Sequence, residues 1–216
     1  MDVGEGSWDG RVWSSPVAFR LAPALGEPAR ALAEKIAGEL RGESGIVAVD
    51  VRGAGVLAVT VAAPGEIVPW VLGRPEAAVA PDRGPVWPDL PRTFENPGFL
   101  VRFAHVRASA VLRWARELRV PDAFTPGALA DPREVRLLGM LAEFPSRARK
   151  PYTLRTYLER LADAYHEVHE RVPALPLGDE EPSAAHASRV RLARAVRRVI
   201  GDGLALLGEP PPPERL

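Results

Sequence analysis

Apolar and polar positions over residues 11–63 alternate in a way that predicts a small α/β unit. A helix is expected over residues 27–42, because three apolar residues recur at a spacing of four: Leu32, Ile36 and Leu40. Two β-rich runs follow at 46–51 and 56–62, and the Gly-containing stretch between them predicts a hairpin turn. The segment "RVWSSPVAFRLAP" ahead of the helix fits either a strand or a short helix.

Proline and glycine are frequent over residues 64–93, and this composition predicts a linker. From residue 96 onward the apolar pattern has a helical period, with prolines at the joints. Four helices are expected, over residues 97–119, 131–143, 150–172 and 185–207.

Composition then narrows the class of protein. The 216 residues are 46% hydrophobic and 26% charged, which is enough for a packed core. No cysteine is present, so disulfides, thiol catalysis and cysteine-bound metals are excluded. No apolar run approaches the roughly 20 residues of a membrane span. The first residues are acidic and do not resemble a signal peptide. We therefore expect a cytoplasmic protein without a membrane partner.

Charge gives a further indication. The net charge is zero, but the surplus of basic residues falls in 94–216, and nearly all of them are Arg. Arginine suits phosphate contacts and stacking on bases, so this half weakly indicates nucleic acid.

The stretch "NPGFLVRFAHVRASAVLRW" (96–114) opens the helical half. One apolar stripe at helical spacing predicts core packing: Phe99, Phe103, Val106, Ala110 and Trp114. Another side is basic: Arg102, His105, Arg113 and Arg116. That side fits a solvated face or a binding face. His105 also fits a buried, hydrogen-bonded histidine.

The last helix has the same two-sided pattern. Its predicted core positions are Leu192, Val196, Val199, Ile200 and Leu204. Its basic positions are Arg191, Arg194, Arg197 and Arg198. A solvated surface and a ridge that follows phosphates fit them equally well.

Catalytic and metal chemistry find little support in the residues. His166 and His169 lie three apart on one helix face, but a zinc protease motif needs a spacing of four and a third ligand is missing. No phosphate-binding glycine loop is present. We expect no metal, no cofactor and no catalytic residue.

The residues quoted above resemble one known family. "NPGFLVRFAHVRASAVLR" resembles the helix that opens the anticodon-binding domain of arginyl-tRNA synthetases, of the DALR type. "LLGMLAEFP", "PYTLRTYLERLADAYHEVH" and "RLARAVRRVIGDGLALLGEPPPPERL" resemble its later helices, in order and at the family's spacing. "LGEPARALAEKIAGELRGESGIVAVDVRGAGVL" resembles the family's N-terminal add-on domain. The resemblance implies an α+β protein: an α/β domain (1–63), a linker (64–93) and an all-α helical bundle that binds anticodons (94–216).

The family's catalytic domain is expected between these two halves, where this chain has only the Pro-rich segment. Neither a His-x-Gly-His motif nor a Lys-Met-Ser-Lys-Ser loop occurs in the sequence. Those motifs handle the ATP phosphates, so the resemblance implies a free-standing relative that does not activate amino acids.

By position, the resemblance implies a tRNA-binding set: Arg102, His105, Arg113, His169, Arg194, Arg197, Arg198 and Leu216. Two of these depart from the family, which commonly has Tyr at His169 and Met at Leu216. The first expected partner is tRNA-Arg, rather than DNA. The alternatives are a protein-interaction module, with a full-length synthetase as one partner, and a tRNA-recognition subunit for a separate catalytic chain.

Overall fold

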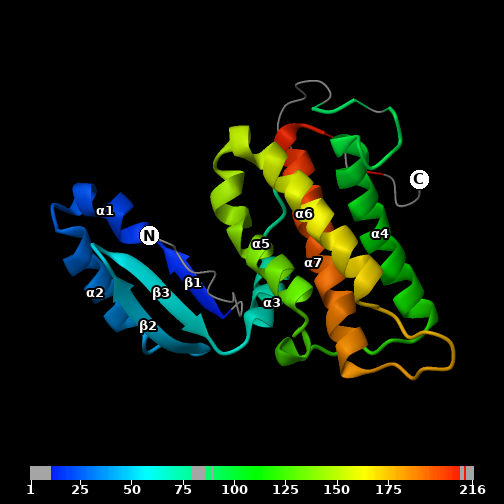
Figure 1. The fold of residues 1–216 in the computed structure, drawn as a ribbon, viewed down its shortest axis with the longest axis horizontal. Coiled ribbons are helices and arrows are strands. Elements are labelled where there is room, and N and C mark those ends of the chain that lie inside the picture. The colour runs from blue at the N-terminus through cyan, green and yellow to red at the C-terminus, as the bar shows by residue number, and fades with distance from the viewer. Residues whose placement is uncertain (1–10, 79–85, 89, 210–211, 213–216) are drawn as a thin grey trace, which may run out of the picture. The chain divides into compact units, whose positions relative to one another are not determined.

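The chain divides after Pro64 into two compact units, each with its own hydrophobic core. The structure, a computed structural model, describes residues 11–78, 86–88, 90–209 and 212 (Figure 1). A three-stranded sheet with two helices comes first and a helical unit follows, which confirms the expected α+β class.

The N-terminal unit is an antiparallel sheet of order β1-β3-β2 with two helices. Its elements are β1 (Val12–Ser15), α1 (Val17–Leu25), α2 (Ala29–Leu40), β2 (Ile46–Arg52) and β3 (Val56–Val61). The segment that fitted either a strand or a helix forms both, β1 and then α1. Strand β3 pairs with β1 from Val12↔Thr60 onward and with β2 up to Arg52↔Val56.

The core of this unit lies between the helices and one face of the sheet. Val49, Val51, Leu57 and Val59 share that face, because they alternate along paired strands and pack with α1 and α2 residues. The turn between β2 and β3 passes close to α2. A Cβ on Gly55, whose φ is +134°, would lie 2.9 Å from the backbone of Ala29. Only glycine fits there without displacing the helix.

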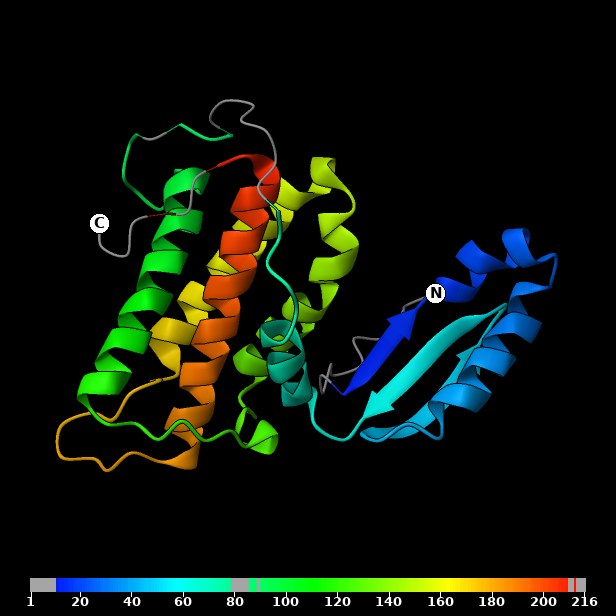
Figure 2. The ribbon, with the colours of Figure 1, turned by 180° about the vertical axis from the view of Figure 1, so that it is seen from behind.

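The second unit is a bundle of long helices (Figures 1 and 2). Helices α4 (Pro97–Glu117), α6 (Pro151–Arg171) and α7 (Ala184–Leu207) pack side by side, and α5 (Pro132–Ala148) packs against α6. Three short helices complete the unit: η1 (Pro64–Glu66), α3 (Ile67–Leu72) and η2 (Pro126–Ala128).

Residues 64–93 differ from the expected linker, because part of them belongs to the bundle. Helix α3 places Val68 and Val71 in the bundle core, and Trp87 is also fully buried there. The helix was not predicted because the proline content of this segment indicated a linker. Pro69 lies in the first turn of α3, where a missing N–H removes no intrahelical hydrogen bond.

Two pieces of this segment, residues 74–78 and 86–88, form a strap that is tied to α7. Asp202 accepts a hydrogen bond from the backbone N–H of Ala77 at 3.2 Å. Glu209, just past the end of α7, accepts one from Val86 at 2.7 Å. The indole of Trp87 donates to Glu159 on α6 at 2.7 Å. Polar bonds and one large apolar side chain therefore hold the strap.

Local signals set the helix ends close to the predicted positions. Asn96 caps α4 by accepting from the backbone N–H of Gly98, and Pro97 occupies the first turn. Gly208 ends α7 in the left-handed conformation, with a φ of +80°. Helix α5 runs past the expected end at residue 143, because Phe144 and Ala148 continue to pack against the core beyond Pro145.

Candidate nucleic-acid interface

Aromatic rings and one guanidinium group gather where the start of α4 meets α6. We call Phe94, Phe99, Phe103, Arg107 and His166 the aromatic–arginine cluster. Phe103 stacks on Phe99, with ring centroids 5.2 Å apart, and lies nearly parallel to His166 at 5.7 Å. Phe94 meets Phe103 and His166 edge-on. The ring of Phe94 is 50% exposed, so one aromatic surface of the cluster faces solvent.

Arg107 is fixed over these rings by polar partners. Its guanidinium carbon lies 4.7 Å from the centroid of Phe103 and 5.6 Å from that of Phe94, which are cation–π distances. The same group donates to a carboxylate oxygen of Glu170 at 2.9 Å. The cation is therefore oriented before any ligand arrives.

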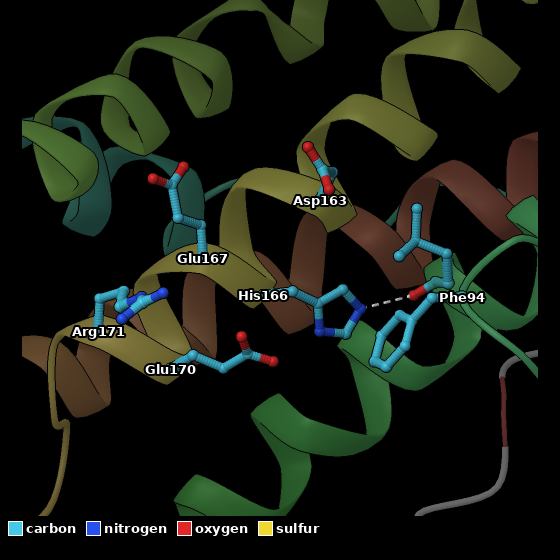
Figure 3. Close-up of a pocket in the computed structure, with 7 residues that line it drawn as sticks. Phe94, Asp163, His166, Glu167, Glu170 and Arg171 are labelled. Atoms are coloured by element: carbon cyan, nitrogen blue, oxygen red, sulfur yellow. Dashed lines mark hydrogen bonds between the residues drawn. The ribbon is translucent and has the colours of Figure 1, made fainter.

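His166 completes this network with both ring nitrogens. Its Nε2–H donates to the carbonyl of Leu100 at 3.0 Å, which Figure 3 shows as a dashed line. Because a carbonyl only accepts, Nδ1 is the unprotonated nitrogen and accepts from Arg107 at 3.1 Å. His166 on α6 thus links the backbone of α4 to the side chain of Arg107.

Burial and charge favour neutral histidines and an ionised glutamate in this network. Burial lowers the pKa of His166 below its usual 6.5, and the nearby Arg107 cation lowers it further. The pKa of His169 is lowered by the same two causes. The hydrogen bond from Arg107 lowers the pKa of Glu170. At neutral pH the network therefore carries one ion pair and two neutral imidazoles.

A depression of about 420 Å³ opens beside the cluster. Its lining residues are Phe94, Leu100, Asp163, His166, Glu167, Glu170 and Arg171 (Figure 3). The aromatic side of the depression suits a flat ring, whereas the carboxylates on α6 disfavour a phosphate. This arrangement can hold an unstacked nucleobase with its backbone directed away from the acidic rim.

The predicted residues on α4 lie in unlike environments. Arg102 is partly buried and pairs with Glu209 at 2.8 Å. His105 is only 7% exposed and lies beside Gly201 of α7, so its ring does not reach solvent. Arg113 is partly exposed. The burial of His105 fits the interpretation of a buried histidine, and its contact with RNA stays a prediction.

The predicted residues on α6 and α7 are also divided. His169 is partly exposed beside Tyr165, one turn from His166, and so adjoins the cluster. Arg194 lies 3.7 Å from Asp122, and Arg198 pairs with Asp202 at 2.9 Å. Arg197 is partly exposed. Leu216 lies outside the described residues. Arg191 also pairs with Asp122, so much of the basic side of α7 is engaged in structural ion pairs.

The expected core stripe of α4 is wrong at its aromatic positions. Trp114 is 59% exposed, and Phe99 and Phe103 are partly exposed. The fully or nearly fully buried face consists of smaller residues: Val101, Ala104, Ala108, Val111, Leu112 and Ala115. Small side chains allow α4 to approach α6 and α7 closely, which leaves no room for large rings.

Sequence reasoning missed Phe94, Arg107, His166 and Glu170 as members of one site. Phe103 and Arg107 are four residues apart, so their contact on one helix face could be predicted from the sequence. The other contacts join α4 to α6 and to a residue at the end of the Pro-rich segment, and no local pattern shows that packing.

The described residues form neither a metal site nor a membrane span. Within residues 11–78, 86–88 and 90–209, no group of three or more His, Cys, Asp or Glu side chains could hold a metal ion. Among the same described residues, no helix has the length and apolar character needed to cross a bilayer.

Comparison with known proteins gives the relationship. The family described as the DALR anticodon binding domain matches residues 101–216. Arginine–tRNA ligase of Clavibacter sepedonicus is 41% identical over 124 residues, and that of Frankia alni is 40% identical over 126. Each alignment covers 54% of this chain and 22% or 23% of the relative, so the chain spans about a fifth of the length of these relatives. Thermus thermophilus arginyl-tRNA synthetase aligns at 26% identity with a TM-score of 0.44, covering 57% of this chain and 22% of that one. The chain therefore belongs to the family of DALR anticodon-binding domains and is related to arginyl-tRNA synthetases.

Proposed function

We propose that the helical unit binds tRNA at its anticodon loop, with tRNA-Arg as the first partner, and that this chain does not itself activate an amino acid. The aromatic–arginine cluster carries the proposal. Sequence-specific RNA recognition takes unstacked loop bases onto aromatic rings and guanidinium planes, and this cluster offers both. The matched relatives are named arginine–tRNA ligases, which favours tRNA-Arg.

The non-catalytic part of the proposal rests on the sequence. The 216 residues contain neither the His-x-Gly-His motif nor the Lys-rich loop that the family uses on ATP. The matched family is itself an anticodon-binding domain. We place this function in the cytoplasm.

Stacking on Phe94 is separable from attraction to phosphates. Phe94→Ala removes the exposed ring without removing a charge. We expect binding of a tRNA-Arg transcript to weaken by about fivefold or more, since stacking of one base contributes about 1–3 kcal/mol. The slope of log affinity against log salt should stay unchanged, because no counterion-releasing contact is lost. Equilibrium binding across a salt series measures both quantities.

Controls make the experiment specific. Arg160→Ala removes an exposed charge six residues before His166, on another side of α6, and should leave stacking intact. Arg197→Ala tests the predicted phosphate contact and should reduce the salt slope by about one. An unrelated tRNA reports discrimination. Absence of binding to either tRNA at low salt would reject the proposal and direct the search to protein partners.

The proposal that this chain does not activate an amino acid is tested by a separate assay. With arginine, ATP and tRNA-Arg, the purified chain should give pyrophosphate exchange and aminoacylation at the background level. Arginylation by this chain alone would contradict the proposal.

A further inference from the structure

A further exposed aromatic ring, that of Trp114, lies on α4 on the C-terminal side of the cluster. Trp114 follows Phe103 by eleven residues, which at 100° per residue places the two about 20° apart around the helix. Their separation along the axis is about 16 Å, from a rise of 1.5 Å per residue. Trp114 is 59% exposed and lies outside the buried core. The core therefore does not account for this ring.

The surface between the two rings is suited to a strand of nucleotides. Ala110 lies between them on the same face, and its small side chain leaves space for a nucleotide at that position. Arg107 and Arg113 lie on opposite sides of this line, at about 40° and 80° from Phe103 around the helix. Glu117, on the same face and exposed, disfavours a phosphate beyond Trp114 and sets the end of the path.

Charge favours RNA over an apolar protein partner on this face. Trp114 has Leu118 as an exposed apolar neighbour one turn later, and arginines flank it, whereas a protein interface usually presents a larger contiguous apolar patch. Aromatic platforms spaced along a basic surface are the usual means of holding single-stranded nucleic acid, because every base has a face on which to stack.

We propose that Trp114 is a second stacking platform, and that single-stranded RNA runs along α4 from the aromatic–arginine cluster to this ring. This inference rests on the proposed function, since the cluster is its starting point. Stacked nucleotides rise about 3.4 Å each, so about five nucleotides span the 16 Å between Phe103 and Trp114. The ligand class is therefore a run of at least about five unpaired nucleotides, rather than a single base.

The test uses fluorescein-labelled oligoadenylates of three, five and nine nucleotides, with the full chain. We expect affinity of the wild-type chain to rise with length, and Trp114→Ala to weaken binding of the nine-nucleotide probe by about fivefold or more. The three-nucleotide probe should bind both proteins equally, because it reaches only the cluster. Trp114→Phe should keep part of the length effect. Tyr152→Ala removes the 81% exposed ring at the start of α6 and should change nothing.

The outcomes separate this inference from the function on which it rests. Equal binding of every probe by the wild-type chain and Trp114→Ala would overturn the role of Trp114 and would make that face a candidate for a protein partner. If Phe94→Ala still weakens all three probes in that case, the proposed function stands. No binding of any probe or of tRNA by the wild-type chain would overturn both.

Discussion

Two tyrosines of α6 bury their hydroxyl groups in contrasting ways. Tyr157 donates to the backbone carbonyl of Met140 at 2.9 Å. The hydroxyl of Tyr165 is equally buried, but among the described residues it has no hydrogen-bond partner. Burial raises the pKa of both groups, so both stay neutral. A paired donor stabilises the bundle, whereas an unpaired one costs the free energy of its lost hydration.

Replacing each tyrosine by phenylalanine should therefore have opposite effects. Tyr157→Phe should lower the free energy of unfolding by about 1 kcal/mol, because Met140 loses its donor. Tyr165→Phe should leave it unchanged or raise it by up to about 1 kcal/mol. Urea unfolding of the two variants and the wild type measures the difference. A loss at Tyr165 as large as that at Tyr157 would show that its hydroxyl has a partner in solution.

His166 should make the stability of the bundle depend on pH. Its pKa is lowered in the folded state, so below about pH 6.5 the unfolded chain binds a proton that the folded chain does not. The free energy of unfolding should then have its highest value from this histidine above about pH 6.5, and it should fall as the pH drops below that value. Arg107, His169 and Glu170 face this ring, and His169 adds to the same trend.

His166→Gln isolates that contribution. Whatever its absolute stability, this variant should lose less free energy of unfolding than the wild type between about pH 7.5 and 5.5. His169→Gln is the matched control and should remove a smaller part of the slope, because His169 is less buried. Identical slopes in the wild type and His166→Gln would rule out this histidine as the source.

At the scale of elements, α6 and α7 touch through a glycine. A Cβ on Gly203 would lie 2.6 Å from a methyl carbon of Leu158, whose side chain is fully buried. A Cβ on Gly201, two residues earlier on α7, would make only an ordinary van der Waals contact, with Nε2 of His105 at 3.8 Å. The two glycines therefore have different roles in one helix.

Alanine substitution should separate these roles. Gly203→Ala should lower the free energy of unfolding by about 1–3 kcal/mol, since Leu158 must move within a packed core. Gly201→Ala should be neutral or raise it by up to about 1 kcal/mol through better helix propensity. Thermal and urea unfolding of both variants would check this, and a stabilising Gly203→Ala would contradict the close contact.

Elements were predictable where their signals are local. Asn96 with Pro97, and Gly208 after a periodic run, place the ends of α4 and α7 within two residues of expectation. The faces of α4 were not predictable in the same way, because Trp114 and Phe99 are more hydrophobic than the alanines that pack. The cluster needed the packing of α4 on α6, which single-helix periodicity does not contain.

At the scale of the whole molecule, the position of the domain boundary is testable. The bundle core includes Val68, Val71 and Trp87, all of which precede residue 94. A fragment of residues 65–216 should therefore unfold cooperatively with a midpoint like that of the second unit in the full chain. A fragment of residues 94–216 loses all three side chains and should be less stable by at least about 3–5 kcal/mol, the usual cost of truncating one large aromatic core residue alone.

Comparing the two fragments by calorimetry and circular dichroism distinguishes the boundaries. Equal stability would favour the boundary expected from proline content, at residue 94. Lower stability of the shorter fragment would place α3 and Trp87 within the folding unit.

The strap has a consequence for how this chain tolerates change in length. Ala77 and Val86 are each held by a carboxylate at the end of α7, Asp202 and Glu209. The two carboxylate residues that hold these ends are seven residues apart in the sequence. Lengthening a loop between fixed ends costs only about 0.6 kcal/mol per doubling. A change in chain length between Ala77 and Val86 is therefore expected to keep both anchors, and to leave undisturbed the helices that hold the aromatic–arginine cluster.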